Sequence, residues 1–156
     1  MKSITYIEKL CKYILVENAS IDLKQYCGWE GIPNLETKYI CIKDGILAGK
    51  EGYGWDGCSG PTWDDASNMR GGLFHDILYQ LMRLGLIPET YKEAADKLLR
   101  DLIKEDSYIL YKRGKIYWIQ YRFCLIRAWY YYSGVDHFAH YAAKYGTEPV
   151  PRSAPV

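Results

Sequence analysis

The chain has 156 residues, of which 49% are hydrophobic and 25% are charged, a composition typical of one globular domain and unlike that of disordered, collagen-like or coiled-coil proteins. Its 20 basic and 19 acidic residues leave a formal net charge of +1, so no global field attracts nucleic acid, and we expect none to bind. The 16 tyrosines and 5 tryptophans suit either a core with polar edges or a binding surface.

The cysteines and the N-terminus indicate where the chain resides. The five cysteines contain no CxxC pair, which favours a reducing compartment over a disulfide framework or a cysteine-rich zinc site. Lys9 and Lys12 interrupt the apolar N-terminal stretch, so we expect no signal peptide. No window approaches the roughly 18 apolar residues of a membrane span, and we expect no transmembrane segment.

The first third of the chain predicts a small β element. Residues 4–17 fit both the strand and the helix template and are left open between the two. Further along, Asp44-Gly45 is the signature of a two-residue hairpin turn, so residues 39–42 and 46–48 are expected to pair as strands. A glycine-rich stretch over residues 52–60 then leads into the helical part.

The hydrophobic pattern next takes the period of helices. Asp64 or Asp65 is expected to cap a first helix that ends at Gly85. Pro88 is expected near the first turn of a second helix, whose apolar stripe runs to Ile103. Because the connection is short, the two helices should lie side by side and antiparallel.

Two further aromatic-rich helices, over about residues 116–132 and 135–145, complete the expected fold. The predicted class is α+β and mainly helical, with a small N-terminal β element leading through a glycine-rich loop into an antiparallel helix hairpin. Residues 1–146 are expected to form a single globular domain. Residues 147–156 hold three prolines and predict an extended tail. The run of aromatics at 129–132 covers every face of a helix, so part of it must be exposed or contact a partner.

The helix pair should bring polar residues together. His75 and Asp96 lie about eleven and about ten residues from the middle of the connection, so at ~1.5 Å rise per residue they should face each other. Tyr79 follows His75 by one turn. A carboxylate facing a histidine orients the imidazole and stabilises its charged form, while the other ring nitrogen accepts a proton from water. The same residues would also form a buried polar clamp that fixes the helix register.

Asp76 should point about 100° away from His75, which leaves its carboxylate for another task. Ca²⁺ prefers six to eight oxygen ligands, and a glycine-rich loop such as residues 55–60 supplies backbone carbonyls. The sequence therefore predicts a calcium site here. The glycines and Pro61 fit plain turn chemistry equally well.

The order of these features resembles a known enzyme site. A glycine-rich loop, the motif HDxxY at residues 75–79 and Ala95-Asp96 resemble secreted phospholipases A2, and more closely the phospholipase A2 site of parvoviral capsid proteins. The likeness covers residues 53–103 and lacks the disulfides of the secreted enzymes. It implies His75 as general base, Asp96 as its orienting partner, Tyr79 as a hydrogen-bond support, Asp76 as calcium ligand, and carbonyls near Trp55, Gly57 and Ser59 as further ligands.

The whole stretch GYGWDGCSGPTW…HDILY…AD resembles still more closely a phage-encoded family of unknown function. This resemblance implies a protein of the infected host's cytoplasm, or one incorporated in the virion. Two functions from different classes follow. The first is a calcium-dependent hydrolase acting on an ester lipid substrate, with phospholipid as its partner. The second is a non-catalytic virion or tail component that binds neighbouring subunits or further copies of itself.

Two other patterns invite a chemical interpretation. His137 and His140, with Asp136, have a spacing that would grip a transition metal, although an unliganded pair is the simpler interpretation. Cys58 beside Ser59 suggests a nucleophile, against which a spare thiol is the simpler interpretation. Metal-dependent phosphohydrolases of the HD type need a further upstream histidine, and none precedes His75.

Overall fold

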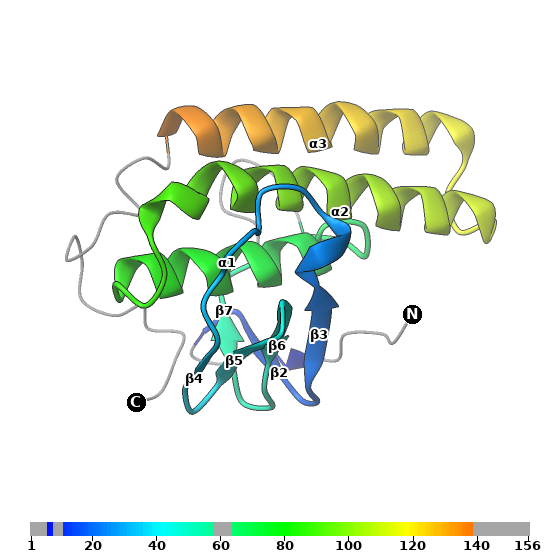
Figure 1. Cartoon of the computed structure of the whole chain (residues 1–156). Helices are drawn as coiled ribbons and strands as arrows, with labels where there is room; N and C mark the ends of the chain where they lie inside the picture. The colour runs from blue at the N-terminus through cyan, green and yellow to red at the C-terminus, as the bar shows by residue number, and fades with distance from the viewer. Residues whose placement is uncertain (1–5, 8–10, 58–63, 139–156) are drawn as a thin grey trace.

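The computed structural model describes residues 6–7, 11–57 and 64–138 of the chain (Figure 1). Its class is α+β, as predicted: short antiparallel strands come first and helices follow. The helices are α1 (Met69–Arg83), α2 (Lys92–Lys112) and α3 (Trp118–Phe138). Figure 1 shows them as stacked layers, with the strands against α1, α2 above α1, and α3 outermost.

The strands form two small antiparallel sheets. One has the order β1-β2-β7 and the other β3-β6-β5-β4. Their bounds are β1 (Tyr6–Ile7), β2 (Tyr13–Leu15), β3 (Ala19–Asp22), β4 (Leu35–Glu36), β5 (Ile40–Lys43), β6 (Ile46–Gly49) and β7 (Gly54–Trp55). Where residues 4–17 are described as regular structure, they are therefore strands. Pairing of β7 with β2 fixes the first part of the glycine-rich stretch.

The predicted hairpin is present between β5 and β6. Asp44 and Gly45 both have positive φ, 49° and 76°, as the two central residues of a type I′ turn require. The strands pair from Lys43 opposite Ile46 onward. Alternate residues, including Ile42 and Leu47, then point into the core.

Helix α1 is the centre of the fold because both of its sides are covered. Its buried side chains pack against the strands and against α2 in one continuous core. Gly71 allows the close approach of α2, since a Cβ at this position would lie 3.1 Å from Leu99 Cδ1 and 3.2 Å from the Leu99 carbonyl oxygen. A helix that is apolar around most of its circumference belongs in the interior.

The start of α1 differs from the expectation. Neither Asp64 nor Asp65 caps the helix: the residue before it is Asn68, which makes no side-chain capping bond. The Asp65 carboxylate instead accepts hydrogen bonds from the backbone and hydroxyl of Ser67 and from Arg127 of α3. Asp64 accepts from the Tyr13 hydroxyl on β2. Asp64 and Asp65 therefore both form hydrogen bonds to other parts of the fold instead of capping α1.

The end of α1 is as predicted. Gly85, at φ 66°, follows the helix, and the N–H groups of Gly85 and Leu86 donate to the carbonyls of Met82 and Leu81. This is the Schellman arrangement that closes a helix with a glycine. After Pro88 comes a short 3₁₀ turn, Glu89–Tyr91, and then α2. The resulting antiparallel hairpin sets the register between the polar residues of α1 and α2.

The third and fourth predicted helices are wrong as separate elements. Helix α3 runs unbroken through Ser133-Gly134 to Phe138 and packs on α2. One interior glycine costs only about 1 kcal/mol relative to alanine, which does not end a helix that has tertiary support.

The predicted tail over residues 147–156 lies outside the described residues. Within the described part of the chain, no helix is both long and apolar enough to cross a membrane.

The turn between α2 and α3 offers a clean test of the helix ends. Gly114 has φ 66° and its would-be Cβ meets no atom within 4 Å, so only backbone conformation disfavours a side chain there. We expect Gly114→Ala to lower the free energy of unfolding by about 1–2 kcal/mol, and Gly114→Asn to lower it less because asparagine tolerates positive φ. Urea unfolding measures both. Equal losses of unfolding free energy in the two variants would contradict the explanation by backbone conformation.

Candidate functional site

The helix hairpin brings His75, Tyr79 and Asp96 together. His75 Nε2 lies 3.1 Å from Asp96 Oδ1, and the Tyr79 hydroxyl donates to the same oxygen at 2.7 Å. The His75 and Tyr79 rings also pack on each other, with centroids 4.1 Å apart. The Asp96 side chain is 0% exposed and that of His75 is 10% exposed. The site is therefore a buried cluster in which the imidazole keeps only a small exposed fraction.

A fourth member, Lys92, was missed by sequence reasoning. Its Nζ lies 2.8 Å from Asp96 Oδ2, so both oxygens of the buried carboxylate have donors. The signal was present, because Lys92 and Asp96 are four residues apart on one helix and such residues are neighbours on its surface. A lysine with an accessible partner at that spacing is common, which is why it did not stand out.

The hydrogen bonds decide which imidazole nitrogen is basic. An ionised carboxylate only accepts hydrogen bonds, so the His75 nitrogen facing Asp96, Nε2, must be the donor. In the neutral ring the lone pair is then on Nδ1. That nitrogen lies 3.8 Å from Asp76 Oδ1, too far for a direct hydrogen bond, and the Asp76 side chain is 30% exposed.

Burial and hydrogen bonding have opposite effects on the pKa values of Asp96 and His75. Burial acts to raise the pKa of Asp96, but the hydrogen bonds from His75, Lys92 and Tyr79 outweigh it, and the pKa is lowered. Burial acts to lower the pKa of His75, but its interactions with Asp76 and Asp96 outweigh it, and the pKa is raised. Asp96 is thus ionised while His75 holds its proton more tightly than usual.

The predicted calcium ligands are only partly placed. Burial raises the pKa of Asp76, and the nearby negative charge of Asp56 raises it further, while His75 and Arg83 act against both. Trp55 ends β7 and is buried, and the backbone at Gly57 packs against the Asp64 carboxylate. Ser59 lies outside the described residues. The described residues contain no set of three histidine, cysteine or acidic side chains arranged to hold a metal ion.

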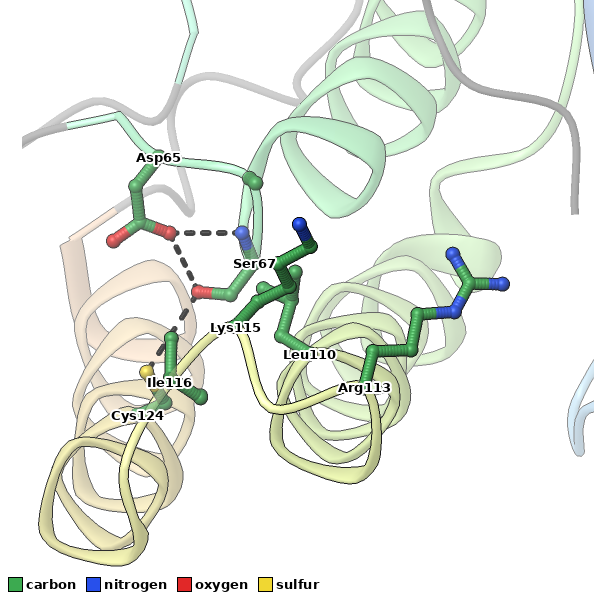
Figure 2. A pocket seen from close by; sticks show the side chains of 8 residues that line it. Asp65, Ser67, Leu110, Arg113, Lys115, Ile116 and Cys124 are labelled. Carbon is green, nitrogen blue, oxygen red and sulfur yellow. Dashed lines mark hydrogen bonds between the residues drawn. The ribbon is translucent and has the colours of Figure 1, made fainter.

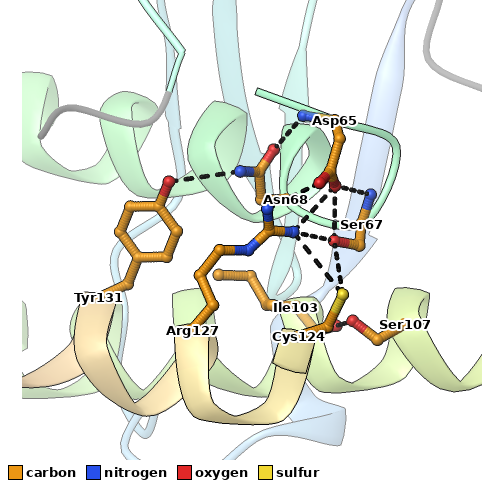
Figure 3. A network of polar contacts seen from close by, with 8 residues as sticks. All are labelled: Asp65, Ser67, Asn68, Ile103, Ser107, Cys124, Arg127 and Tyr131. Atoms are coloured by element: carbon orange, nitrogen blue, oxygen red, sulfur yellow. Dashed lines mark hydrogen bonds and ion pairs between the residues drawn. The ribbon is translucent and has the colours of Figure 1, made fainter. Parts of the chain in front are cut away.

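A second polar network joins α3 to the start of α1 (Figure 3). The Arg127 guanidinium donates to both Asp65 oxygens, at 2.7 and 2.9 Å, and also contacts the Ser67 hydroxyl. Asn68 donates to the Tyr131 hydroxyl at 3.3 Å. Bidentate pairing of this kind fixes orientation as well as distance. The network holds α3 in place against α1, and nothing in the local sequence of either helix indicated it.

A cavity of about 490 Å³ adjoins this network, between the start of α1 and the α2–α3 turn (Figure 2). It is lined by Asp65, Ala66, Ser67, Leu110, Arg113, Lys115, Ile116 and Cys124. The Ser67 hydroxyl lies 3.8 Å from the Cys124 sulfur, but the described network offers no histidine to serve as a base. Cys58 and the side chains of Asp136, His137 and His140 lie outside what the structure describes.

Comparisons with protein-family models, with curated proteins and with solved structures found no match to this chain. The geometry around His75 therefore carries the functional interpretation. Of the seven residues that the sequence singled out for the site, the structure joins His75, Tyr79 and Asp96 by hydrogen bonds and places Asp76 at the free edge of the imidazole.

The raised pKa of His75 makes stability depend on pH. Because the folded-state pKa lies above the unfolded value of about 6.5, the stabilisation is fully present below that value and is lost as the pH rises through the folded pKa. We expect the free energy of unfolding, measured in urea, to fall as the pH rises above about 6.5. This decrease of the unfolding free energy with pH should be much smaller in His75→Gln, and in Asp106→Asn it should be the same as in the wild type. A His75→Gln protein with the wild-type slope would contradict this assignment.

Proposed function

We propose that the chain is a hydrolase that cleaves an ester bond in a lipid, with His75 as the general base. One observation carries this proposal: Nε2 of the imidazole is fixed on a buried carboxylate, which leaves Nδ1 as the basic nitrogen on the edge toward Asp76. An oriented base of this kind is what activation of water requires. The motif resemblance to phospholipases A2 supports the ester of a lipid as the substrate class.

In the proposed reaction, His75 first accepts a proton and then donates it, and neighbouring side chains of the chain support both steps. Nδ1 of His75 accepts a proton from a water molecule as the water oxygen attacks the ester carbonyl carbon. Asp96 stabilises the imidazolium that forms, and Tyr79 and Lys92 hold Asp96 in place. The imidazolium then gives its proton to the alcohol oxygen of the ester as that bond breaks. Asp96 and Tyr79 are positioning residues in this scheme.

We also propose that calcium belongs to this site. The Asp76 carboxylate is 30% exposed beside the free edge of the His75 imidazole, and carboxylate oxygens are ligands that Ca²⁺ prefers. Backbone carbonyls near Trp55, Gly57 and Ser59 would supply further oxygen ligands. When bound, the ion would stabilise the negative charge that develops on the ester oxygen.

The resemblance to a phage-encoded family extends the proposal to a protein of the infected cytoplasm or the virion. A different function has one observation in its favour, the complete burial of Asp96. In that case the cluster is a polar clamp that fixes α1 against α2. The chain would then be a non-catalytic virion or tail component that binds neighbouring subunits or copies of itself.

Substitution of the base separates these two functions. In the hydrolase, His75→Gln should lower the rate of hydrolysis of a fluorogenic phospholipid by at least about 100-fold, and Asp96→Asn should lower it strongly. Asp106→Asn is the matched control: Asp106 is a buried carboxylate of the same helix, but it pairs with Arg70. The wild-type rate should increase with pH through the raised pKa of His75, since the base must be neutral.

If all three variants lose stability alike and the wild type hydrolyses no phospholipid with calcium present, the clamp is the better explanation. Removal of one partner from a buried charge pair costs about 3–5 kcal/mol, so each assay must be run at a temperature where urea unfolding shows the variant to be folded. Retention of the full rate by His75→Gln would contradict the proposed base directly.

Calcium binding is testable without activity. An ion that binds only the folded chain raises the melting temperature, by an amount that grows with the ratio of free ion to Kd. We expect calcium to raise the melting temperature of the wild type and of Asp106→Asn, and a chelator to reverse the rise. Asp76→Asn should abolish it. An equal rise in Asp76→Asn would place the ion elsewhere.

A further inference from the structure

Helix α3 has an apolar face that no described element covers. One face, with Cys124, Ala128 and Tyr131, packs toward α2 and the start of α1. The opposite face carries Ile119, Phe123 and Ile126, which are 71%, 55% and 65% exposed. In Figure 1 this helix is the outermost layer. The exposed large hydrophobic side chains of α3 and of the residue before it are Tyr117, Trp118, Ile119, Phe123, Ile126, Trp129 and Tyr130.

The spacing makes these residues a continuous stripe. Positions 119, 123, 126 and 130 recur at four, three and four residues, so they line one side of the helix. Trp118 and Trp129 flank them. Isolated exposed apolar side chains are normal on a soluble protein, but a contiguous aromatic and aliphatic patch marks a surface that binds something.

The segment of the chain that carries the stripe is basic. From Ser107 to Val135 the sequence contains no acidic residue. It contains five basic residues, of which Arg127 is buried and paired with Asp65, whereas the others, Lys112, Arg113, Lys115 and Arg122, are exposed. The Arg122 guanidinium lies 5.8 Å from the centre of the Trp118 ring. The stripe is therefore aromatic and aliphatic, with the cation of Arg122 beside it.

We propose that this face of α3 binds the surface of an anionic phospholipid bilayer, with the helix lying in the plane of the interface. Tryptophan and tyrosine are favoured at the headgroup level, and isoleucine and phenylalanine at the boundary of the acyl chains. Arg122, whose guanidinium lies over the Trp118 ring, would meet lipid phosphates and add attraction to an anionic surface. This inference goes beyond the proposed hydrolase and does not require His75 to be catalytic.

Two other occupants fit the surface less well. A second copy of the chain would bring the same stripe and Arg122 to the contact, and residues 107–135 offer no acidic side chain to pair with that arginine. A nucleic acid is bound through a row of cations that follows its phosphates. Along the described part of α3, Arg122 is the one exposed cation, so no row of cations follows the stripe.

Flotation with lipid vesicles tests the proposal on the full chain. We expect the protein to float with vesicles of equimolar phosphatidylcholine and phosphatidylglycerol, and less with phosphatidylcholine alone. Phe123→Asp and Ile126→Asp should each weaken binding about tenfold, and Arg122→Gln should reduce the preference for phosphatidylglycerol. These side chains are exposed, so circular dichroism should show an unchanged fold. Leu86→Asp, at an exposed apolar residue of the α1–α2 connection, is the matched control and should bind as the wild type does.

The other outcomes overturn the proposal. No flotation, together with a dimer in light scattering that Phe123→Asp dissociates, would assign the face to a second copy. Binding of a fluorescent oligonucleotide in preference to vesicles would assign it to nucleic acid. Equal binding of Phe123→Asp and the wild type to vesicles would remove α3 from the interface. His75→Gln should float like the wild type, so failure of the hydrolase proposal remains distinguishable from failure of this one.

Discussion

The arrangement of the helices depends on one buried carboxylate. Asp96 has no exposed surface, and an ionised carboxylate removed from water without partners would cost several kcal/mol. It is tolerated because His75 and Tyr79 of α1 and Lys92 of its own helix all approach it. Two of these three partners come from the neighbouring helix, so the carboxylate ties the register of α1 to that of α2 whatever chemistry the cluster performs.

The same device is repeated along α1. Near its start, Arg70 pairs with the buried Asp106 of α2 at 2.9 Å. Just before the helix, Asp65 pairs with Arg127 of α3. An ion pair contributes little net stability when the cost of desolvation is included, but a mismatched register would leave a charge buried and unpaired. These contacts therefore specify the alignment of three helices, and apolar packing around α1 supplies the driving force for folding.

Local features of the fold could be predicted and distant pairings could not. The turn at Asp44-Gly45 and the end of α1 at Gly85 follow from backbone conformations that nearby residues determine. The approach of His75 to Asp96 followed from helix rise, since a short connection leaves little freedom. The expected cap failed because Asp65 bonds to Arg127, 62 residues away, a contact with no local signature. Lys92 had such a signature, but helix spacing does not tell a structural ion pair from a solvated one.

The candidate dyad and the apolar face of α3 lie on different sides of α2. His75 and Asp96 meet where α1 packs on α2, whereas the stripe through Phe123 points away from α2 altogether. A bilayer held against α3 would therefore concentrate the protein at a lipid surface without bringing the imidazole to that surface. An ester lipid would have to reach His75 from the edge where Asp76 is exposed. The proposed membrane attachment and the proposed hydrolysis therefore depend on different residues and can be tested separately.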